Sequence, residues 1–559
     1  MARIDEQIVQ AQAALQQRPG DAGLWLRLGM MQRHNGDFPG AINSFTRCIA
    51  VEPGSMRAWT YVGFCFLDLF KLKEALESFN FVLQLAPREA EALFGCAVVH
   101  ECMGDHAAAL QLLEQAIDAD PDHAQFYAYR ASLQATHGGD PALTLSGFRR
   151  WAERFADPLT AAAAPFTLDR RPGRRLRIGY VSADLRDHAV AYFVEPIFAR
   201  HDRGNFHVCV FSSGPEDAVT TRLKRGVDQW FDVSAMDDAQ VHQLVRRQKI
   251  DVLIDLSGHT RGHRLLCFAR RAAPVQATWL GYMYTTGMHA MDYRITDGLM
   301  DPPGMTEAAH SETLFRLRAS AIYHPPADAP FTAEPPLHAR GAVAFASLNN
   351  LKKVTDDMLR LWKRILEAVP EATLTLISAE RTLEEALERQ GPRLAALGLP
   401  LERVCLLPRL PMADFMRLGL ETDIALDTSP VSGGTTTLHS LWMGLPIICM
   451  AGRQAFGAAT ASPLRLLGYE ELVANDAEGY VAAAVALARS PERIAAFRAG
   501  VRERMRASPL MDYDAFVRDM EAAYRLMWLN HLAGERAYTH TGYDLQQEIA
   551  ARGVLPRAA

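Results

Sequence analysis

Hydrophobic positions in the first third of the chain recur with the period of amphipathic helices, and the whole pattern repeats every 34 residues. Three columns of matching residues make the repeat visible: Pro19, Pro53, Pro87 and Pro121; Ala41, Ala75 and Ala109; Trp25, Trp59 and Leu93. Small residues let two helices approach closely, and the proline ends the second helix of each pair. The pattern predicts an α-solenoid of three full repeats over residues 22–123, with a half repeat before it and a degenerate one after it, in a helical domain at 1–165.

From residue 175 onward, short apolar runs alternate with amphipathic helical stretches. The strand candidates form two series: 176–181, 207–211, 251–255, 277–280 and 293–296, then 342–346, 374–377, 404–407, 424–426 and 446–449. Such alternation predicts parallel sheets covered by helices, in two units at 175–330 and 340–530 that are divided by a Pro-rich stretch. The expected fold class is therefore α plus α/β, with ligands bound beyond the carboxyl ends of the strands or between the two units.

Two further segments mark boundaries. The stretch Arg-Arg-Pro-Gly-Arg-Arg at 170–175 breaks the helical pattern and is expected to be a solvated linker. Residues 512–531 look helical and carry several aromatic side chains, which predicts a helix that packs into a core. The remaining residues, 531–559, are expected to form a C-terminal tail.

Composition and charge narrow the class of protein. A net charge of -6 gives no indication of DNA, RNA or an anionic membrane as the main partner. The eight cysteines include no CxxC pair and lie mostly in apolar runs, so we expect reduced core thiols and a cytoplasmic location. No basic-then-apolar leader begins the chain and no uncharged apolar stretch of membrane-spanning length occurs, so neither secretion nor membrane insertion is expected.

One loop carries the clearest candidate chemistry. No Walker loop and no GxGxxG after a strand is present, which disfavours an ATPase or a simple dehydrogenase. The stretch DTSPVSGGTTTLHSLWMG at 427–444 instead places two glycines and three threonines between a strand candidate and a helix candidate. Gly433 and Gly434 permit close backbone approach, and a helix N-terminus offers free N–H groups to an anion. The same residues are equally compatible with a threonine-capped helix that binds nothing.

Metal chemistry is not expected. The two Asp-X-Asp matches, at 118–120 and 512–514, lie in a repeat and beside a probable helix start. His259 and His263 are four residues apart but lack the glutamate of a zinc-binding HExxH helix, and a glycine lies between them.

Five motifs in order, at 179–188, 274–282, 291–297, 348–353 and 427–437, together resemble the O-linked N-acetylglucosamine transferases, glycosyltransferase family 41. The helix pairs before them resemble tetratricopeptide repeats. The resemblance implies a GT-B fold of two Rossmann-like lobes, with a UDP-sugar held mainly by the second lobe. A GT-B protein would return the helix at 512–531 across the lobes, as an alternative to a plain core-packing helix. It also implies inverting, metal-independent transfer of N-acetylglucosamine to Ser or Thr hydroxyls of proteins, with protein or peptide acceptors bound along the repeat groove.

The resemblance also assigns site residues. Lys353 matches the lysine that contacts the diphosphate, and Asn350 lies where several relatives have Gln. Gly434, Thr435 and Thr436 match the phosphate-binding segment, which Thr437 extends. His188 matches the proposed general base, although a role in orienting the sugar or diphosphate is equally open. The other assignments are Leu410, Pro411, Met412, Phe415 and Leu418 around base and ribose, Leu280 and Gly281 near the sugar, and Arg261 as a basic position of the first lobe.

Three positions depart from the family pattern, and two of them bear on the donor. Gly434 replaces a histidine, His439 replaces the ribose-binding aspartate, and Phe415 replaces another histidine. We expect UDP-N-acetylglucosamine as donor, with GDP-fucose or UDP-glucose as alternatives. A weakly active tetratricopeptide scaffold that binds nucleotide is a third hypothesis.

Overall fold

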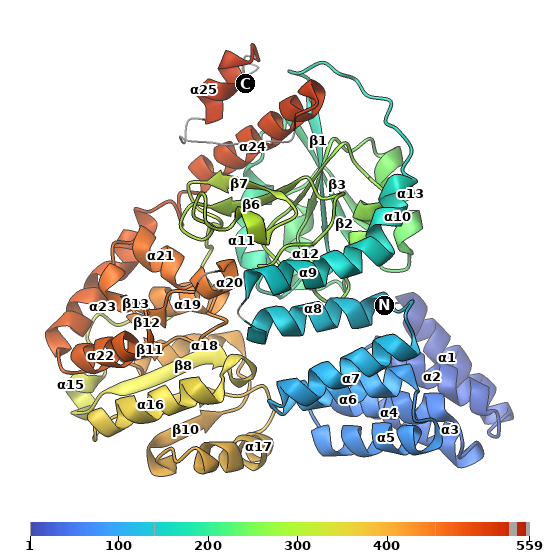
Figure 1. Ribbon diagram of the computed structural model, residues 1–559, viewed down its shortest axis with the longest axis horizontal. Helices are drawn as coiled ribbons and strands as arrows, with labels where there is room; N and C mark the ends of the chain where they lie inside the picture. Colours follow the sequence, from blue (N-terminus) through green and yellow to red (C-terminus); the bar gives the residue numbers. More distant parts are fainter. Residues whose placement is uncertain (1, 139, 453, 536–544, 555–559) are drawn as a thin grey trace. The chain divides into compact units, whose positions relative to one another are not determined.

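The computed structural model describes residues 2–138, 140–452, 454–535 and 545–554 (Figure 1). By its internal contacts the chain divides into two compact units, Met1–His137 and Gly138–Ala559. The first unit holds the helical repeats and the second holds both sheets. The predicted fold class is therefore confirmed.

The first unit is a series of helix pairs. Its helices are α1 Ala2–Gln17, α2 Ala22–His34, α3 Phe38–Val51, α4 Met56–Asp68, α5 Leu72–Leu85, α6 Ala90–Cys102, α7 His106–Ala119 and α8 Ala124–Gly138. A Cβ added at Gly63 would lie 2.6 Å from the Phe79 ring, and Gly95 presses on the same ring from the next helix. Glycine is therefore required at these two positions for the close helix packing that the repeat pattern predicts.

The helices that follow the repeats pack with the second unit. They are α9 Pro141–Trp151, a π-helical turn at Ala152–Ala156 and α10 Asp157–Ala161. The Phe148 ring stacks on His259 at 4.7 Å between centroids, and the Thr160 hydroxyl donates to the Ala269 carbonyl at 2.8 Å. The predicted repeat domain extended to residue 165, whereas the first compact unit ends at His137. The aromatic face of α9 covers the first sheet lobe instead of continuing the solenoid.

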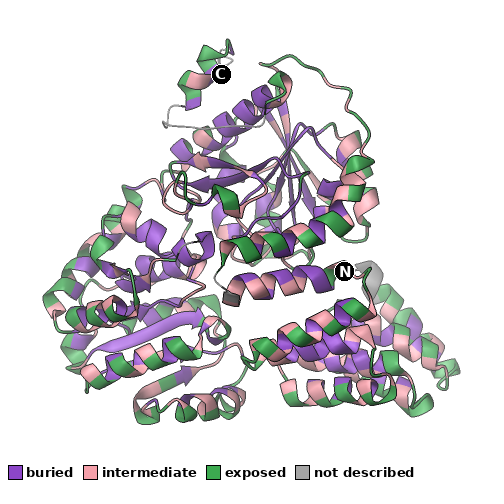
Figure 2. Cartoon of the chain, viewed as in Figure 1, coloured by how far each residue is buried: buried purple, intermediate pink, exposed green. Residues whose placement is uncertain are grey.

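The first lobe is a seven-stranded parallel sheet with the order β3-β2-β1-β4-β5-β6-β7. Its strands are β1 Leu176–Ser182, β2 Phe206–Ser212, β3 Gln229–Asp232, β4 Val252–Asp255, β5 Val275–Thr278, β6 Tyr293–Asp297 and β7 Thr313–Leu317. Its helices are α11 Ala191–Arg200, α12 Ala218–Lys224, α13 Asp238–Arg247 and α14 Leu265–Ala269. Figure 2 shows that the central strands are buried, as their near-continuous apolar runs require.

The second lobe repeats this order with six strands, β10-β9-β8-β11-β12-β13. They are β8 Ala344–Asn350, β9 Thr373–Ile377, β10 Val404–Leu407, β11 Ile424–Leu426, β12 Ile447–Met450 and β13 Val473–Ala474. The helices are α15 Leu337–Arg340, α16 Asp356–Ala368, α17 Leu383–Ala396, α18 Met412–Arg417, α19 Thr435–Met443, α20 Ala455–Ala458, α21 Ala461–Leu466, α22 Ala477–Ala488 and α23 Pro491–Arg506. In each lobe the third, second, first and fourth strands are consecutive neighbours.

Helix α24, Tyr513–Ala533, follows the second lobe but belongs to the core of the first. Met520, Tyr524 and Trp528 are fully buried there, which confirms the predicted core-packing face. The Tyr524 hydroxyl lies 2.9 Å from that of Tyr180 in β1. The predicted second unit, 340–530, includes most of α24 because it follows that lobe in the sequence. The helix packs in the core of the first lobe instead. A short helix, α25 Leu545–Ala551, lies after it.

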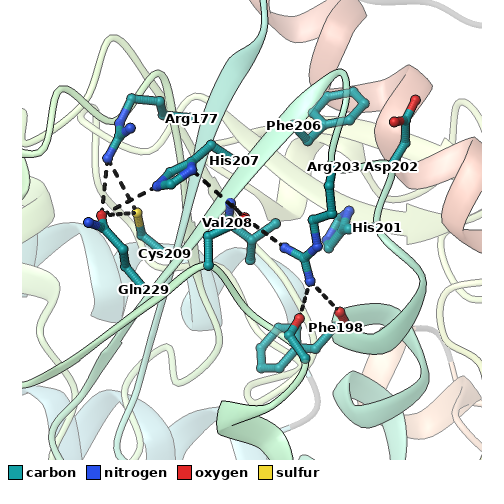
Figure 3. A network of polar contacts seen from close by, with 12 residues as sticks. Arg177, Phe198, His201, Asp202, Arg203, Phe206, His207, Val208, Cys209 and Gln229 are labelled. Atoms are coloured by element: carbon teal, nitrogen blue, oxygen red, sulfur yellow. Dashed lines mark hydrogen bonds and ion pairs between the residues drawn. The ribbon is translucent and has the colours of Figure 1, made fainter. Parts of the chain in front are cut away.

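Polar side chains tie together the amino-terminal halves of β1, β2 and β3 (Figure 3). Arg177 donates to Gln229 Oε1 at 3.2 Å, and Arg203 pairs with Asp228 at 2.9 Å. This network lies at the amino-terminal ends of the strands. Ligands of such sheets bind at the opposite, carboxyl ends.

The Arg-rich stretch at 170–175 is only partly a solvated linker. Arg174 donates to Asp251 Oδ2 at 2.7 Å and its guanidinium lies 4.6 Å from the centre of the Trp528 ring. The prediction was therefore wrong for this arginine, because its planar head can pair with a buried carboxylate and stack on an aromatic ring together.

None of the helices in the described part of the chain combines the length and hydrophobicity that a bilayer crossing requires. The described residues also contain no group of three or more His, Cys, Asp or Glu side chains placed to hold a metal ion. Asp512 of the second Asp-X-Asp match caps α24 by accepting from Ala515 N at 3.0 Å.

Candidate active site

Each sheet has a switch point between its first and fourth strands, where the following loops diverge and leave a crevice. In the first lobe, His188 lies in the loop after β1. In the second lobe, Lys353 lies in the turn after β8, and residues 427–434 connect β11 to α19. Three of the predicted elements thus come from switch points, which explains why residues far apart in the sequence converge.

The two lobes enclose a cavity of about 200 Å³. Five of the predicted site residues line it: His188, Leu280 and Gly281 from the first lobe, and Gly434 and Thr435 from the second. Leu280 has a positive φ of 74°, a conformation that a leucine adopts only when its surroundings impose it. A Cβ at Gly281 would overlap the Leu256 carbonyl, so only glycine fits there. This wall of the cavity is therefore rigidly shaped.

Helix α19 points its N-terminus at the cavity through Gly434 and Thr435. The first N–H groups of a helix have no partner within the helix and carry the positive end of its dipole, so an anion is favoured there. A Cβ added at Gly434 would lie 3.0 Å from Met283 Cε of the first lobe. Met283 thus takes up space beside the position where the family pattern has a histidine.

Lys353 meets the loop before α19 and is not among the residues that line the 200 Å³ cavity. Its Nζ donates to the Ser432 carbonyl at 3.3 Å. Burial lowers the pKa of Lys353, and the charge of Asp427 opposes that shift. Asn350 is exposed and its side chain accepts from Lys352 N at 3.0 Å, which caps the short turn that positions Lys353.

The threonines of α19 differ in their surroundings. Thr435 lines the cavity, whereas Thr437 is buried and its hydroxyl lies 2.7 Å from that of Thr460. The Thr437 side chain therefore holds the loop in place, and its backbone N–H is the group left for an anion. Thr436 accepts from the Ser440 hydroxyl through its carbonyl at 2.8 Å and is not a lining residue of the cavity.

His439 is buried next to the cavity-lining Leu438. Its Nδ1 lies 2.7 Å from the Tyr323 hydroxyl, and its Nε2 has no hydrogen-bond partner among the described residues. Burial lowers the pKa of His439 to about 4, so the ring is neutral at pH 7. The rings of Tyr192 and Phe415 lie 5.0 and 6.0 Å away.

None of the predicted base and ribose residues is among the residues that line the cavity. Leu410 and Phe415 are partly buried against the second-lobe core, Leu418 is buried, and Pro411 and Met412 are exposed. The Phe415 ring packs edge-on against that of His439, another predicted residue. Arg261 is exposed in the turn after β4 and is not a lining residue of the cavity.

His188 is half-buried at the cavity. Val190 N donates to its Nδ1 at 3.4 Å, and its Nε2 lies 3.9 Å from Asp184 Oδ1. Burial lowers the pKa of His188, with Asp184 opposing the shift, so the ring is neutral at pH 7.

Several lining residues were not predicted. They are mostly apolar, with Arg294 and Asp297 as the charged exceptions: Phe193, Trp279, Met283, Ile295, Met300, Leu438, Ala459, Pro463 and Leu466 among others. Trp279 directly follows β5 and Asp297 ends β6, so their position at carboxyl ends of strands could have identified them, whereas Arg294 is the second residue of β6. No sequence signal marks the residues of α21. Asp427, at the end of β11, was also missed as a site residue.

Together these features define a two-lobed GT-B protein preceded by tetratricopeptide repeats, with a cavity where the two switch points meet. Residues 159–322 and 336–520 match the model of glycosyl transferase family 41, and residues 55–122 match a tetratricopeptide repeat model. The chain belongs to glycosyl transferase family 41.

Relatives and a solved structure agree with this assignment. The chain is 37% identical over 426 residues to a probable UDP-N-acetylglucosamine–peptide N-acetylglucosaminyltransferase, SPINDLY, of Solanum lycopersicum, which covers 75% of this chain and 45% of the relative. It is 38% identical over 386 residues to the Arabidopsis thaliana SPINDLY protein, covering 68% and 42%. The structure of a Thermobaculum terrenum O-GlcNAc transferase mutant superimposes with a TM-score of 0.84 at 34% identity, covering 92% of this chain and 98% of that one. The chain spans less than half the length of the curated relatives that it matches.

Proposed function

We propose that the protein is an inverting glycosyltransferase that moves N-acetylglucosamine from UDP-N-acetylglucosamine to Ser or Thr hydroxyls of proteins. The observation that carries the proposal is the convergence of His188, Leu280 and Gly281 with the N-terminus of α19 around one cavity. The names of the relatives and the O-GlcNAc transferase structure support the same activity.

In the proposed reaction, the acceptor oxygen attacks the anomeric carbon from the face opposite UDP. The new C–O bond forms while the bond from that carbon to the phosphate oxygen breaks, and UDP leaves with the bonding electrons. The developing negative charge is met by Lys353 and by the first N–H groups of α19, which are fixed before the reaction begins. We propose that these groups supply the stabilisation without a metal ion or another cofactor.

The acceptor hydroxyl must lose a proton, and two roles for His188 make different predictions. A neutral imidazole at the cavity is suited to accept that proton. However, the contact from Val190 N to Nδ1 leaves the proton of the neutral ring on Nε2, which favours a hydrogen-bond donor that orients the sugar or the diphosphate. The pH profile of a His188 variant separates the two roles.

We further propose that protein or peptide acceptors bind along the repeat unit, as the concave surface of a solenoid allows. A cytoplasmic location is supported by the eight cysteines, all of which carry free thiols and most of which are buried. Nucleic acid and membrane are not proposed as partners.

His439 and Gly434 favour a second donor as an alternative. A neutral histidine, whose Nε2 has no hydrogen-bond partner in the described ranges of the chain, replaces the expected carboxylate, and Met283 lies beside Gly434. Both changes alter which hydroxyls of a nucleotide sugar the site can hold, so GDP-fucose and UDP-glucose remain donors to compare.

The test is a transfer assay with intact-protein mass spectrometry. A pool of purified acceptor proteins is incubated with this chain in three separate reactions, which contain UDP-N-acetylglucosamine, UDP-glucose or GDP-fucose as donor. We expect the mass increment of N-acetylglucosamine on Ser or Thr with the first donor, and a strongly reduced increment with the Lys353→Met variant. Transfer only from another donor would support the alternative, and nucleotide binding with no hydrolysis or transfer would support a scaffold.

A further inference from the structure

One peptide group in the loop before α19 is held at both of its polar ends by oppositely charged side chains. Lys353 Nζ donates to the carbonyl oxygen of Ser432 at 3.3 Å. The N–H of Gly433 donates to Asp427 Oδ1 at 2.9 Å. The carbonyl and the N–H belong to the same planar peptide unit. The ammonium therefore lies at the negative end of the peptide dipole and the carboxylate at its positive end.

Asp427 is placed for this contact by its own surroundings. It follows β11 directly and is 3% exposed. Asn349 Nδ2 donates to the same Oδ1 at 2.8 Å, and the Tyr480 hydroxyl donates to the Asp427 carbonyl at 2.8 Å. The second carboxylate oxygen, Oδ2, has no hydrogen-bond partner in the described part of the chain. A buried carboxylate with an unpartnered oxygen is costly unless a nearby charge compensates it.

We propose that Asp427 is a positioning residue of the donor site: with Lys353 it clamps the Ser432–Gly433 peptide, keeps the lysine charged and directs the first N–H groups of α19 into the cavity. The proposal deepens the proposed function and rests on it for the identity of the diphosphate. Gly433 fits the clamp because a Cβ there would lie 2.6 Å from the Thr437 hydroxyl oxygen and 3.2 Å from Asn349 Oδ1.

Electrostatics at the clamp agree with its geometry. Burial lowers the pKa of Lys353 and raises the pKa of Asp427, and each charge opposes the shift of the other. The other titratable groups that interact with Asp427 are Tyr480 and Cys449, and burial raises the pKa of both, so they stay neutral. The Asp427 charge is what opposes the pKa shift of Lys353, whereas hydrogen bonds, that of the Gly433 N–H among them, oppose the shift of Asp427 more than the Lys353 charge does.

The neighbouring charges of the turn are occupied elsewhere or lie in solvent. Asp356, three residues after Lys353, pairs with Arg393 at 2.8 Å. Lys352 is exposed. Removing the Asp427 charge is therefore expected to make Lys353 lose its proton at lower pH.

The first experiment measures this titration without any ligand. Competitive acetylation of Lys353 is followed by mass spectrometry across pH, in a Lys352→Arg background so that one lysine reports. Asp427→Asn keeps a side-chain acceptor and removes the charge. Asp423→Asn is the matched control, because Asp423 is buried at the opposite end of β11 and accepts from Leu337 N and Ala344 N, both at 2.9 Å.

We expect the pH of half-maximal labelling to fall in Asp427→Asn and to stay unchanged in Asp423→Asn. An unchanged midpoint in Asp427→Asn, or an equal shift in the control, would overturn the proposal. If Asp427→Asn does not fold, the double variant with Lys353→Met is expected to fold again, because it leaves no buried charge unpaired. A double variant that stays unfolded while Lys353→Met folds would also contradict the clamp.

The second experiment is calorimetry with UDP at pH 7.5. Asp427→Ala removes the anchor of Gly433 as well as the charge, and we expect about tenfold weaker binding, or about 1.4 kcal/mol. Asp423→Asn is expected to bind as the wild type does, and equal affinity of Asp427→Ala and wild type would count against the clamp. A Lys353 shift in the labelling experiment without UDP binding by the wild type would keep the clamp and reject the nucleotide. UDP binding by the wild type without a Lys353 shift in Asp427→Asn would support the nucleotide site and reject the clamp.

Discussion

Both lobes place a buried aspartate at the end of their fourth strand, yet the two aspartates do different work. Asp255, at the end of β4, accepts from Ser257 N at 3.1 Å and Gly258 N at 2.8 Å, and the Thr278 hydroxyl adds a third bond. All three partners belong to the first lobe, and none of them is charged. Asp427 anchors one loop N–H, leaves one oxygen without a hydrogen bond among the described residues, and interacts with the charge of Lys353.

The same topology therefore supports two kinds of crevice. In the first lobe the fourth strand leads into a tight turn, and the cavity receives apolar side chains and His188. In the second lobe it leads into a loop and a nine-residue helix, α19. The N-terminus of α19 and Lys353 from the turn after β8 present positive charge there. The fold supplies the meeting point, and the loops divide the chemistry between the two lobes.

The largest effect is expected when the positive charge of the second-lobe site is removed. Lys353→Met should lower kcat about 10²- to 10³-fold, because the charge that faces the leaving diphosphate is lost. Steady-state transfer assays measure the loss. Lys352→Met is the control, since the Lys352 side chain neighbours Lys353 in the sequence but is exposed. Comparable loss in both variants would mean that the whole turn matters, not the clamped lysine.

The next prediction concerns the first lobe. If His188 is the base, His188→Ala should lose about 10²-fold in kcat. The wild-type kcat/KM should then fall at acidic pH, because a protonated imidazole cannot accept a proton, and the variant should lack that acidic limb. Loss confined to KM, with the acidic limb retained, would instead assign the orienting role.

A third prediction uses Asp255 to sharpen the contrast between the two aspartates. Burial raises the pKa of Asp255 to about 6, above about 3.9 in the unfolded chain. The folded state therefore binds this proton more tightly, and the stabilisation is present below pH 4 and lost as pH rises through 6, by about 3 kcal/mol. Thermal unfolding of the wild type and Asp255→Asn at pH 4.5 and 7.5 measures the difference. Identical pH dependence in the two proteins would contradict the assignment.

The smallest expected effect concerns Thr437. Thr437→Val removes the hydroxyl contact with Thr460 and should cost about 1 kcal/mol of stability. Transfer should fall only modestly, because the backbone N–H remains. Thr435→Val, which changes a cavity-lining side chain, is the matched comparison. A larger loss of stability in Thr435→Val than in Thr437→Val would reverse the roles given to them.

Much of the fold could be predicted because buried parallel strands and recurring repeats leave strong patterns. All ten predicted strands overlap observed ones, while β3, β7 and β13 were missed. β3 lies at a sheet edge and is largely exposed, β7 carries an arginine, and β13 has two residues, so none forms a clear apolar run. The residue pattern of α24 predicted only a core-packing face, because which core a helix covers is a long-range property. Its return to the first lobe was an alternative that only the family resemblance implied.

Site residues that belong to a sequence motif could be predicted. Residues whose exposure or orientation depends on tertiary packing could not. His188, Gly434 and Thr435 reach the cavity as expected. Pro411 and Met412 are exposed, and the Thr437 hydroxyl is turned toward Thr460, which spacing along the sequence cannot reveal. Asp427 is the first residue of the predicted loop, but its proposed function depends on Lys353. That Lys353, which follows β8, lies near this loop is known only from the fold.

A crystal structure of this chain with UDP would show where the diphosphate binds. We expect it against the N–H groups of Gly434 to Thr436, with Lys353 Nζ in contact with a phosphate oxygen and Asp427 still bonded to Gly433. A diphosphate bound elsewhere, or bound at this loop with Lys353 turned away, would contradict this expectation.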